Sequence, residues 1–362
     1  MKNQIKEFQI VIGSSRDELL DYKDPKAQTH NSFLRQSHML SQVNQDILEI
    51  VKVLCENGYK VKTLCKGECD SFEGFWIPQS PVFSEKSKEL GAVNESISVP
   101  DSISMGLGQG ANPVFNWLNN ASERPRDAFV QIGKKIYLNK DYYPRRIDKK
   151  THKGYISRMD WLISSQPRPL FLSSYEEERL DERLEPVLES SPFGEGGKII
   201  TFRDFILASD DIRKRIKLNR EQFGSEIYFL RPISTEDKKD IISENKRQHI
   251  DYHVNGVDLA GYSMILVDPS FYKKNSGVFE EIQRKHSVKL VFVDENETQS
   301  VPANFLVLPD GKTLMPAGTK KTQKILEEEL GSENILVTKK LPHLLKSGYG
   351  IRCISNTLAY YI

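Results

Sequence analysis

Apolar residues recur at the spacing of an amphipathic helix in several stretches of the chain, and each stretch leads into a short apolar strand. In the first stretch, five apolar residues share one helical face: Val43, Ile47, Ile50, Val51 and Leu54. Gly58 follows them as a typical C-terminal stop, and residues 59–64 form the predicted strand.

The same order of helix and strand recurs twice in the second half of the chain. A helix predicted at 279–286 leads into a strand at 288–293. A second helix at 322–330, closed by Gly331, leads into a strand at 335–337.

Two tight hairpins stand near these units. One joins the apolar runs 128–132 and 135–138, and the other joins 304–308 and 313–315. Repeated units of hairpin, helix and strand indicate an α/β protein built from several short sheets with helices outside, rather than one continuous parallel sheet.

Bulk composition excludes some classes of partner. The 362 residues include 51 basic and 50 acidic side chains, so the net charge of +1 argues against nucleic acid or an anionic membrane as a general partner. No apolar run is long enough to span a membrane, and the first residues lack the apolar centre of a signal peptide. Four cysteines do not form a secreted disulfide framework, so we expect a cytoplasmic protein.

No long Gly/Ser linker divides the chain, so we expect one catalytic domain over residues 1–362. The charged stretch 142–190 is predicted to be an insertion or a lid, because structureless segments of that length are usually functional or disordered.

Cys353 is the first candidate for chemistry. It follows Gly348 and Gly350, a context typical of a tight turn in which a thiol can reach a ligand. The alternative is a buried, inert cysteine on the last strand. Only partner residues can decide between a nucleophile and this structural role.

The segment from His249 to His253 offers a base beside a carboxylate. If it is extended, His249, Asp251 and His253 point to the same face. A metal site would need a further ligand, and the sequence has no recognisable zinc frame, so we expect none. A structural histidine pair is the remaining alternative.

Two further acids stand beside predicted strands. Glu195 precedes Gly196 and Gly197, which allow sharp backbone geometry at the mouth of a strand. Asp127 follows Arg126, just before the first hairpin. Taken alone, the first segment is an ordinary glycine-rich turn and the second a cap or salt bridge.

Together, and in this order, the four segments resemble the signature of the guanidino-group-modifying enzymes across about residues 120–362. That family includes arginine deiminase, agmatine deiminase, dimethylarginine hydrolase, peptidylarginine deiminase and glycine amidinotransferase. Its fold, the pentein, is a five-bladed α/β propeller, which the resemblance therefore implies here. The residues that match its motifs are Asp127, Glu195, His249, Asp251 and Cys353.

The chemistry of this set can also be argued from the residues. A guanidinium is a planar cation that carboxylates hold through paired hydrogen bonds, and a thiolate can attack its central carbon. The resemblance implies catalytic roles for Cys353, His249 and Glu195. It implies substrate binding by Asp127, Asp251 and Arg352.

We therefore expect a thiol-dependent deiminase that converts an arginine-like guanidine into a ureido product and ammonia, without cofactor or metal. An amidinotransferase shares every catalytic residue and remains the alternative, and a non-catalytic pentein that serves as a binding module is the third hypothesis. The substrate is a small guanidino compound or a protein arginine side chain. The sequence leaves open whether the protein forms a homo-oligomer. Tyr349 stands where many relatives carry a glycine, which leaves the choice of substrate open.

Overall fold

The computed structural model describes residues 5–13, 30–66, 81–97, 126, 129–132, 135–138, 185–187, 196–217, 223–233, 249–347 and 349–361. The chain divides into two compact units. Unit 1 comprises Met1–Ser191 with Leu358–Ile362, and unit 2 comprises Pro192–Thr357. Strand β16 (Ser355–Tyr361) begins in unit 2 and ends in unit 1.

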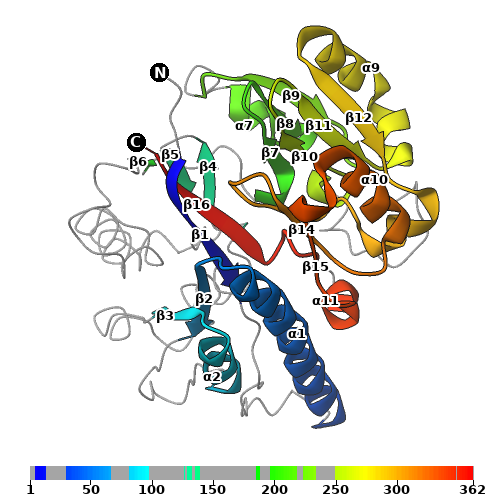
Figure 1. The fold of residues 1–362 in the computed structure, drawn as a ribbon. Helices are drawn as coiled ribbons and strands as arrows, with labels where there is room; N and C mark the ends of the chain where they lie inside the picture. The colour runs from blue at the N-terminus through cyan, green and yellow to red at the C-terminus, as the bar shows by residue number, and fades with distance from the viewer. Residues whose placement is uncertain are drawn as a thin grey trace, which may run out of the picture. The chain divides into compact units, whose positions relative to one another are not determined.

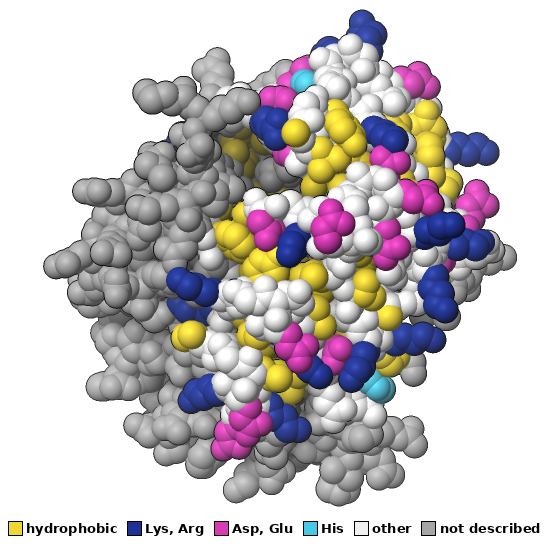
Figure 2. All heavy atoms as spheres, in the orientation of Figure 1, with side chains coloured by type: hydrophobic (Ala, Val, Ile, Leu, Met, Phe, Trp, Pro, Cys, Tyr) yellow, Lys and Arg dark blue, Asp and Glu magenta, His cyan; other side chains and the backbone are white. Residues whose placement is uncertain are grey.

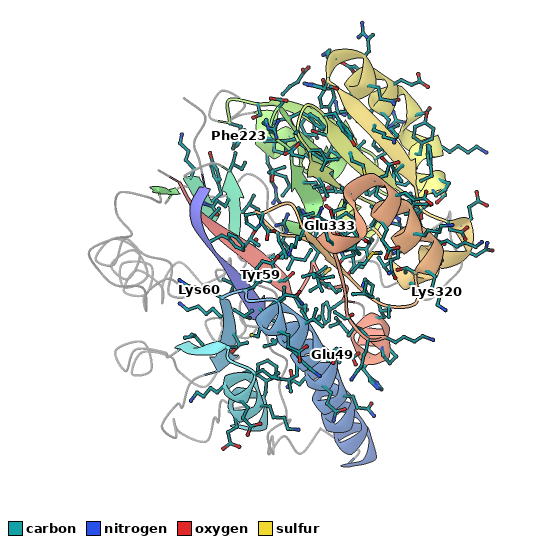
Figure 3. All side chains as sticks on the ribbon, in the orientation of Figure 1. Glu49, Tyr59, Lys60, Phe223, Lys320 and Glu333 are labelled. Atoms are coloured by element: carbon teal, nitrogen blue, oxygen red, sulfur yellow. The ribbon has the colours of Figure 1, made fainter. Side chains whose placement is uncertain are left out.

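The first sheet of unit 1 has the strand order β16-β1-β2-β3. Its other elements are β1 (Ile5–Gly13), α1 (His30–Glu56), β2 (Val61–Lys66), α2 (Pro81–Glu89) and β3 (Val93–Ile97). The apolar face predicted for α1 is buried along its whole length, from Val43 to Leu54. Gly58 adopts a φ of 80°, a left-handed conformation that ends the helix. Tyr59 and Lys60 then lead into β2, as Figure 3 shows.

A second sheet in unit 1 contains β4 (Phe129–Ile132), β5 (Lys135–Leu138) and β6 (Glu185–Val187). β4 and β5 pair antiparallel, which confirms the predicted hairpin. β6 lies inside the stretch 142–190 and pairs parallel with β5, so this part of the stretch belongs to the sheet. The rest of 142–190 falls outside the described residues.

Unit 2 contains three more short sheets with the same plan. They are β7 (Ile199–Thr201), β8 (Phe205–Ser209) and β9 (Glu226–Leu230); β10 (Val254–Asp258), β11 (Ser263–Val267) and β12 (Val288–Phe292); and β13 (Leu306–Val307), β14 (Thr313–Met315) and β15 (Ile335–Val337). In each sheet the first two strands pair antiparallel and the third returns parallel to the second. The α/β fold class and the repeated unit of hairpin and crossover strand are therefore confirmed.

Helices connect the second and third strands of these sheets. They are α7 (Arg213–Lys217), α9 (Pro269–Lys285) and α10 (Lys320–Leu330), and α11 (Pro342–Ser347) follows the last sheet. Asp268 caps α9 by accepting from the backbone N–H of Ser270 at 2.8 Å. Figure 1 shows α9 alongside β12, where the two elements are in contact. Figure 3 marks Lys320 and Glu333 at the two ends of α10 and its following turn.

The sheet of β10, β11 and β12 separates two apolar cores of unit 2. Ile265 and Val267 of β11 face one core, which also holds Phe271 and Phe279 of α9. Met264 and Leu266 face the other core, which holds Leu326 of α10. Successive side chains of a strand point to opposite faces, so a continuous apolar run is what a strand between two cores requires.

Charged side chains of both signs are interspersed over the described part of the face shown in Figure 2, with apolar side chains between them. This distribution agrees with the near-balance of acidic and basic residues in the sequence. Among the helices that the structure describes, none has the length and apolar character to cross a bilayer.

Candidate active site

The candidate site of unit 2 is built from short segments that each stand just before the first strand of a hairpin or sheet. The 3-10 turn η3 (Gly196–Lys198) precedes β7, and the 3-10 turn η6 (Ile250–Tyr252) precedes β10. Asn304 precedes β13, and a turn over 351–354 precedes β16. The sheets of β7, β10 and β13 share one plan, so the first three segments occupy equivalent positions in successive repeats.

Cys353 lies in the turn before the last strand, as the glycine context predicts. Its side chain is 5% exposed. The sulfur lies 3.3 Å from the Tyr252 hydroxyl and 3.4 Å from Nδ2 of Asn304. The alternative prediction, an inert cysteine on the strand itself, is wrong about position, since β16 begins only at Ser355.

Asn304 joins the cysteine turn to the histidine segment. Its Nδ2 donates to the backbone carbonyl of Asp251 at 3.1 Å, and its Oδ1 accepts from the backbone N–H of Arg352 at 2.9 Å. These partners fix which end of the amide faces which group. Both ends lie near the Cys353 sulfur, Nδ2 at 3.4 Å and Oδ1 at 3.7 Å. A Cβ at Gly350 would collide with Asn304, so this glycine is required by a close approach.

Asp251 and Arg352 form an ion pair inside unit 2. The Asp251 side chain is fully buried, and its Oδ2 lies 3.3 Å from Nη1 of Arg352. Nη2 of Arg352 donates to the carbonyl of Ile199 at 3.2 Å. Within the described residues, neither carboxylate oxygen of Asp251 accepts a hydrogen bond of good geometry. Two substrate-binding candidates thus lie against each other, and the acid keeps capacity for further donors.

His249 is buried at the start of η6, and its ring lies against Tyr252, with ring centroids 6.2 Å apart. A Cβ at Gly197 would collide with the imidazole, so the lack of a side chain at this position lets the backbone of η3 pack on the ring. The second glycine of that segment therefore has a structural purpose at the histidine.

The prediction that His249, Asp251 and His253 share one face is wrong, because residues 250–252 form a 3-10 turn rather than a strand. Residues two apart lie on different sides of such a turn. His253 stacks on Phe271 and faces the Asp268 carboxylate at 3.6 Å.

For His253 the structural alternative is therefore the better description. Within the described ranges, no three His, Cys, Asp or Glu side chains gather as a metal site would require.

Glu195 and Asp127 lie outside the described residues. Along the chain Glu195 directly precedes η3, and Asp127 stands two residues before β4. Their roles remain predictions.

Tyr252 and Asn304 contact the sulfur, and sequence reasoning did not single out either as a site residue. Tyr252 lies inside the recognised motif, between Asp251 and His253. Asn304 is a poor strand former at the start of an apolar hairpin, which is a local signal for a special role.

The arrangement brings a thiol, a buried carboxylate and an imidazole segment into one network. Hydrogen bonds link Cys353 to Tyr252 and Asn304, and Asn304 links the same turn to Asp251. Such a network can present a sulfur nucleophile to a planar cation that a carboxylate orients.

No protein-family model matches the chain, and no curated protein matches it in sequence. Solved structures do match its fold. The amidinotransferase SxtG from Microseira wollei, of the saxitoxin biosynthetic pathway, shares 15% identity at a TM-score of 0.51, with 98% of this chain and 96% of that chain covered.

Two hydrolases are also among the similar structures. A dimethylarginine dimethylaminohydrolase adduct shares 13% identity at a TM-score of 0.47, covering 98% of this chain and all 100% of that one. The N-terminal domain of ArgZ, an arginine dihydrolase of the cyanobacterial ornithine-ammonia cycle, shares 13% identity at 0.46, with 98% of each chain covered.

The full-length match to SxtG shows that the two chains share a fold, as expected from the resemblance to the guanidino-group-modifying enzymes that the sequence motifs indicate.

Proposed function

We propose that this protein is a cysteine-dependent enzyme that modifies guanidino groups, and that it hydrolyses an arginine-like guanidine to a ureido product and ammonia. The observation that carries the proposal is the bridge made by Asn304, which contacts Cys353 and binds the backbone of Asp251. This bridge ties the proposed nucleophile to an acid suited to the cation.

The electrostatics of the network support a cationic substrate. Asp251 is fully buried and has lone pairs left for donors, while a guanidinium offers several N–H groups in one plane. A bound cation beside the sulfur also favours thiolate over thiol. The substrate would thereby help to activate the group that attacks it.

The proposed reaction has two halves. The Cys353 thiolate attacks the central guanidine carbon, and ammonia leaves from that carbon after His249 protonates its nitrogen. Water then attacks the covalent S-amidino intermediate while His249 accepts its proton. The C–S bond breaks and returns the thiolate, so one water is consumed and one ammonia is released.

Glu195, Asp127 and Arg352 complete the proposed site. The two acids would accept hydrogen bonds from the guanidinium, and Glu195 would also take part in proton transfer. Arg352, held by Asp251 and Ile199, would form part of the substrate-binding wall. We place this chemistry in the reducing cytoplasm, because the proposed nucleophile must stay a free thiol.

A single five-bladed pentein domain is the architecture that we propose for the whole chain. The repeated plan of the sheets supports it, since four of the five sheets in the described residues consist of an antiparallel hairpin followed by a parallel strand. The equivalent placement of the candidate residues before their strands is what converging blades would require.

Amidino transfer is the second candidate, and it is the activity named for SxtG, which matches the fold. In that reaction the substituted nitrogen leaves first and an amine replaces water in the second half. Cys353 and His249 would serve both reactions, so the acceptor admitted to the closed site decides between them.

The test is a panel of guanidines: arginine, agmatine, a methylated arginine and an arginine-containing peptide, each with and without glycine as an amine acceptor. Ammonia and ureido product report hydrolysis, and an amidinated amine reports transfer. We expect turnover of one member, with a covalent adduct on the tryptic peptide of residues 353–362, which contains Cys353 as its only cysteine. Neither turnover nor an adduct with any member would contradict the proposal.

A further inference from the structure

Tyr252 lies next to two of the proposed catalytic groups, Cys353 and His249. Its hydroxyl lies 3.3 Å from the Cys353 sulfur, and its ring lies against the His249 imidazole. The side chain is 7% exposed, so it meets the sulfur away from bulk water. The motif residues on either side of it, Asp251 and His253, have separate ionic partners.

The contact between sulfur and phenol changes character with the charge of the sulfur. A neutral thiol is a weak donor that can point its hydrogen at the phenol oxygen. A thiolate is an acceptor only, so the phenol O–H must then donate to it. Hydrogen bonds to an ionised group are roughly twice as strong as those between neutral groups, so the contact favours the thiolate form.

Asn304 supplies a second uncharged donor to the same sulfur. Its Nδ2 lies 3.4 Å from Sγ, closer than the amide oxygen Oδ1 at 3.7 Å, and the amide is held in place by Asp251 and Arg352. The positive charge of Arg352 is paired with the Asp251 carboxylate, whose negative charge offsets it. The groups that can stabilise the thiolate before any cation binds are therefore the Tyr252 hydroxyl and the Asn304 amide, which are uncharged dipoles close to the sulfur.

We propose that Tyr252 is a catalytic residue, and that its hydroxyl donates a hydrogen bond to the Cys353 thiolate and raises the fraction of thiolate at neutral pH. This inference rests on the proposed function, because it takes Cys353 as the nucleophile. It adds a donor that acts before substrate arrives and again when the C–S bond breaks and charge returns to the sulfur.

The experiment measures the rate at which iodoacetamide alkylates Cys353 as a function of pH, without any guanidine. Trypsin cleaves after Arg352, so mass spectrometry of the peptide 353–362 reports this cysteine alone. In Tyr252→Phe we expect the midpoint of the profile to move up by about one to two pH units, because a hydrogen bond to a charged group is lost.

Tyr228→Phe is the matched control. It also removes a tyrosine hydroxyl that is hydrogen-bonded, to His286 at 3.0 Å, but in a different part of unit 2. Its alkylation profile should superimpose on that of the unchanged protein. If the profile of Tyr252→Phe also superimposes on that of the unchanged protein, and its circular dichroism spectrum is unchanged, the inference is overturned. The hydroxyl would then be absent from a folded protein without any effect on the ionisation of the thiol.

A second variant keeps the test decisive if Tyr252→Phe does not fold. Incorporation of 3-fluorotyrosine at position 252 keeps the shape of the ring and makes the phenol a stronger donor. The midpoint should then move to lower pH, and no movement or an upward movement would overturn the inference.

The two proposals fail separately. Alkylation needs no substrate, so an unshifted profile in an enzyme that turns over a guanidine rejects the role of Tyr252 alone. A shifted profile in a protein that neither turns over nor forms an adduct with any guanidine rejects the proposed function, and leaves Tyr252 as a donor to a reactive thiol of another kind.

Discussion

The two cysteines whose side chains the structure describes lie in opposite chemical surroundings. Cys55 is half-buried on helix α1, and burial raises the pKa of its thiol. Cys353 is more deeply buried, yet its sulfur contacts the hydroxyl of Tyr252 and the amide of Asn304. Burial by itself opposes the thiolate, whereas polar donors at the sulfur favour it.

How deeply a thiol is buried therefore does not by itself decide whether it is reactive. A cysteine on an amphipathic helix loses water and gains only packing, so it behaves as a small apolar residue. A cysteine in a turn between strands can be equally dry and still be surrounded by fixed dipoles.

Exchange of the two thiols for hydroxyls should give the largest difference. Cys353→Ser should lower the rate of guanidine turnover by at least about 1,000-fold, because serine does not ionise near neutral pH and the nucleophile is lost. Cys55→Ser should change the rate by less than about twofold. Steady-state kinetics with the substrate identified from the panel measures both. Comparable rates for the two variants would show that Cys353 is not the nucleophile.

Loss of the buried acid should be the next largest effect. Asp251→Asn leaves the buried guanidinium of Arg352 without its counter-charge, which should lower the free energy of unfolding by about 3 kcal/mol or more. The double variant Asp251→Asn with Arg352→Met should recover part of this loss, because both charges are then removed. Urea unfolding followed by circular dichroism measures the three proteins. A double variant less stable than Asp251→Asn would show that the pair is not the source of the effect.

A methyl group added at each of two glycines should have different effects on stability, because one glycine is closely packed and the other faces open space. Gly350→Ala should cost about 1–3 kcal/mol, because the new methyl group meets Asn304 and displaces it from Cys353. Gly277→Ala lies within α9, where a Cβ meets no atom within 4 Å. It should be neutral or stabilising by about 0.5–1 kcal/mol, since alanine favours a helix. Thermal unfolding distinguishes the two variants, and equal destabilisation would contradict the close approach of Gly350 to Asn304.

The smallest effect concerns an exposed ion pair of unit 2. Hydrogen bonding to Lys321 holds the pKa of Asp294 below its ordinary value of 3.8. A carboxyl whose folded pKa is depressed contributes stability above its unfolded pKa and loses that contribution as pH falls through the folded value. Lys321→Met should therefore lower the stability slightly above about pH 4, where the interaction is present, and change it little at lower pH, where Asp294 is protonated in both proteins. Urea midpoints against pH provide the measurement, and a difference between the two proteins that grows as pH falls would contradict it.

The helices and hairpins could be predicted because their signals are local. The apolar face of α1 and the stop at Gly58 need only the residues of one helix, and both are confirmed. Helix α9 begins ten residues before the predicted start at Phe279, at the cap formed by Asp268 and Pro269. That signal is local too, since an acid followed by proline is a typical helix start.

The histidine segment shows where local reasoning stops. Alternation over 249–253 would suit a strand, but the backbone carbonyl of His253 accepts from the N–H of Asp268 at 2.7 Å, and the segment folds as a 3-10 turn. That bond joins the turn to the start of α9, and it redirects His253 away from the neighbours that alternation would give it.

The sequence by itself determined the repeated units, the turn before the last strand and the residue types that suit a guanidinium, because these depend on spacing along a few residues. Only the tertiary structure decided what surrounds the sulfur. Tyr252 and Asn304 stand 101 and 49 residues before Cys353, and they reach it because the segments before β10, β13 and β16 meet. The periodic pattern of apolar residues does not predict this contact between distant segments, since it follows from how the sheets pack together.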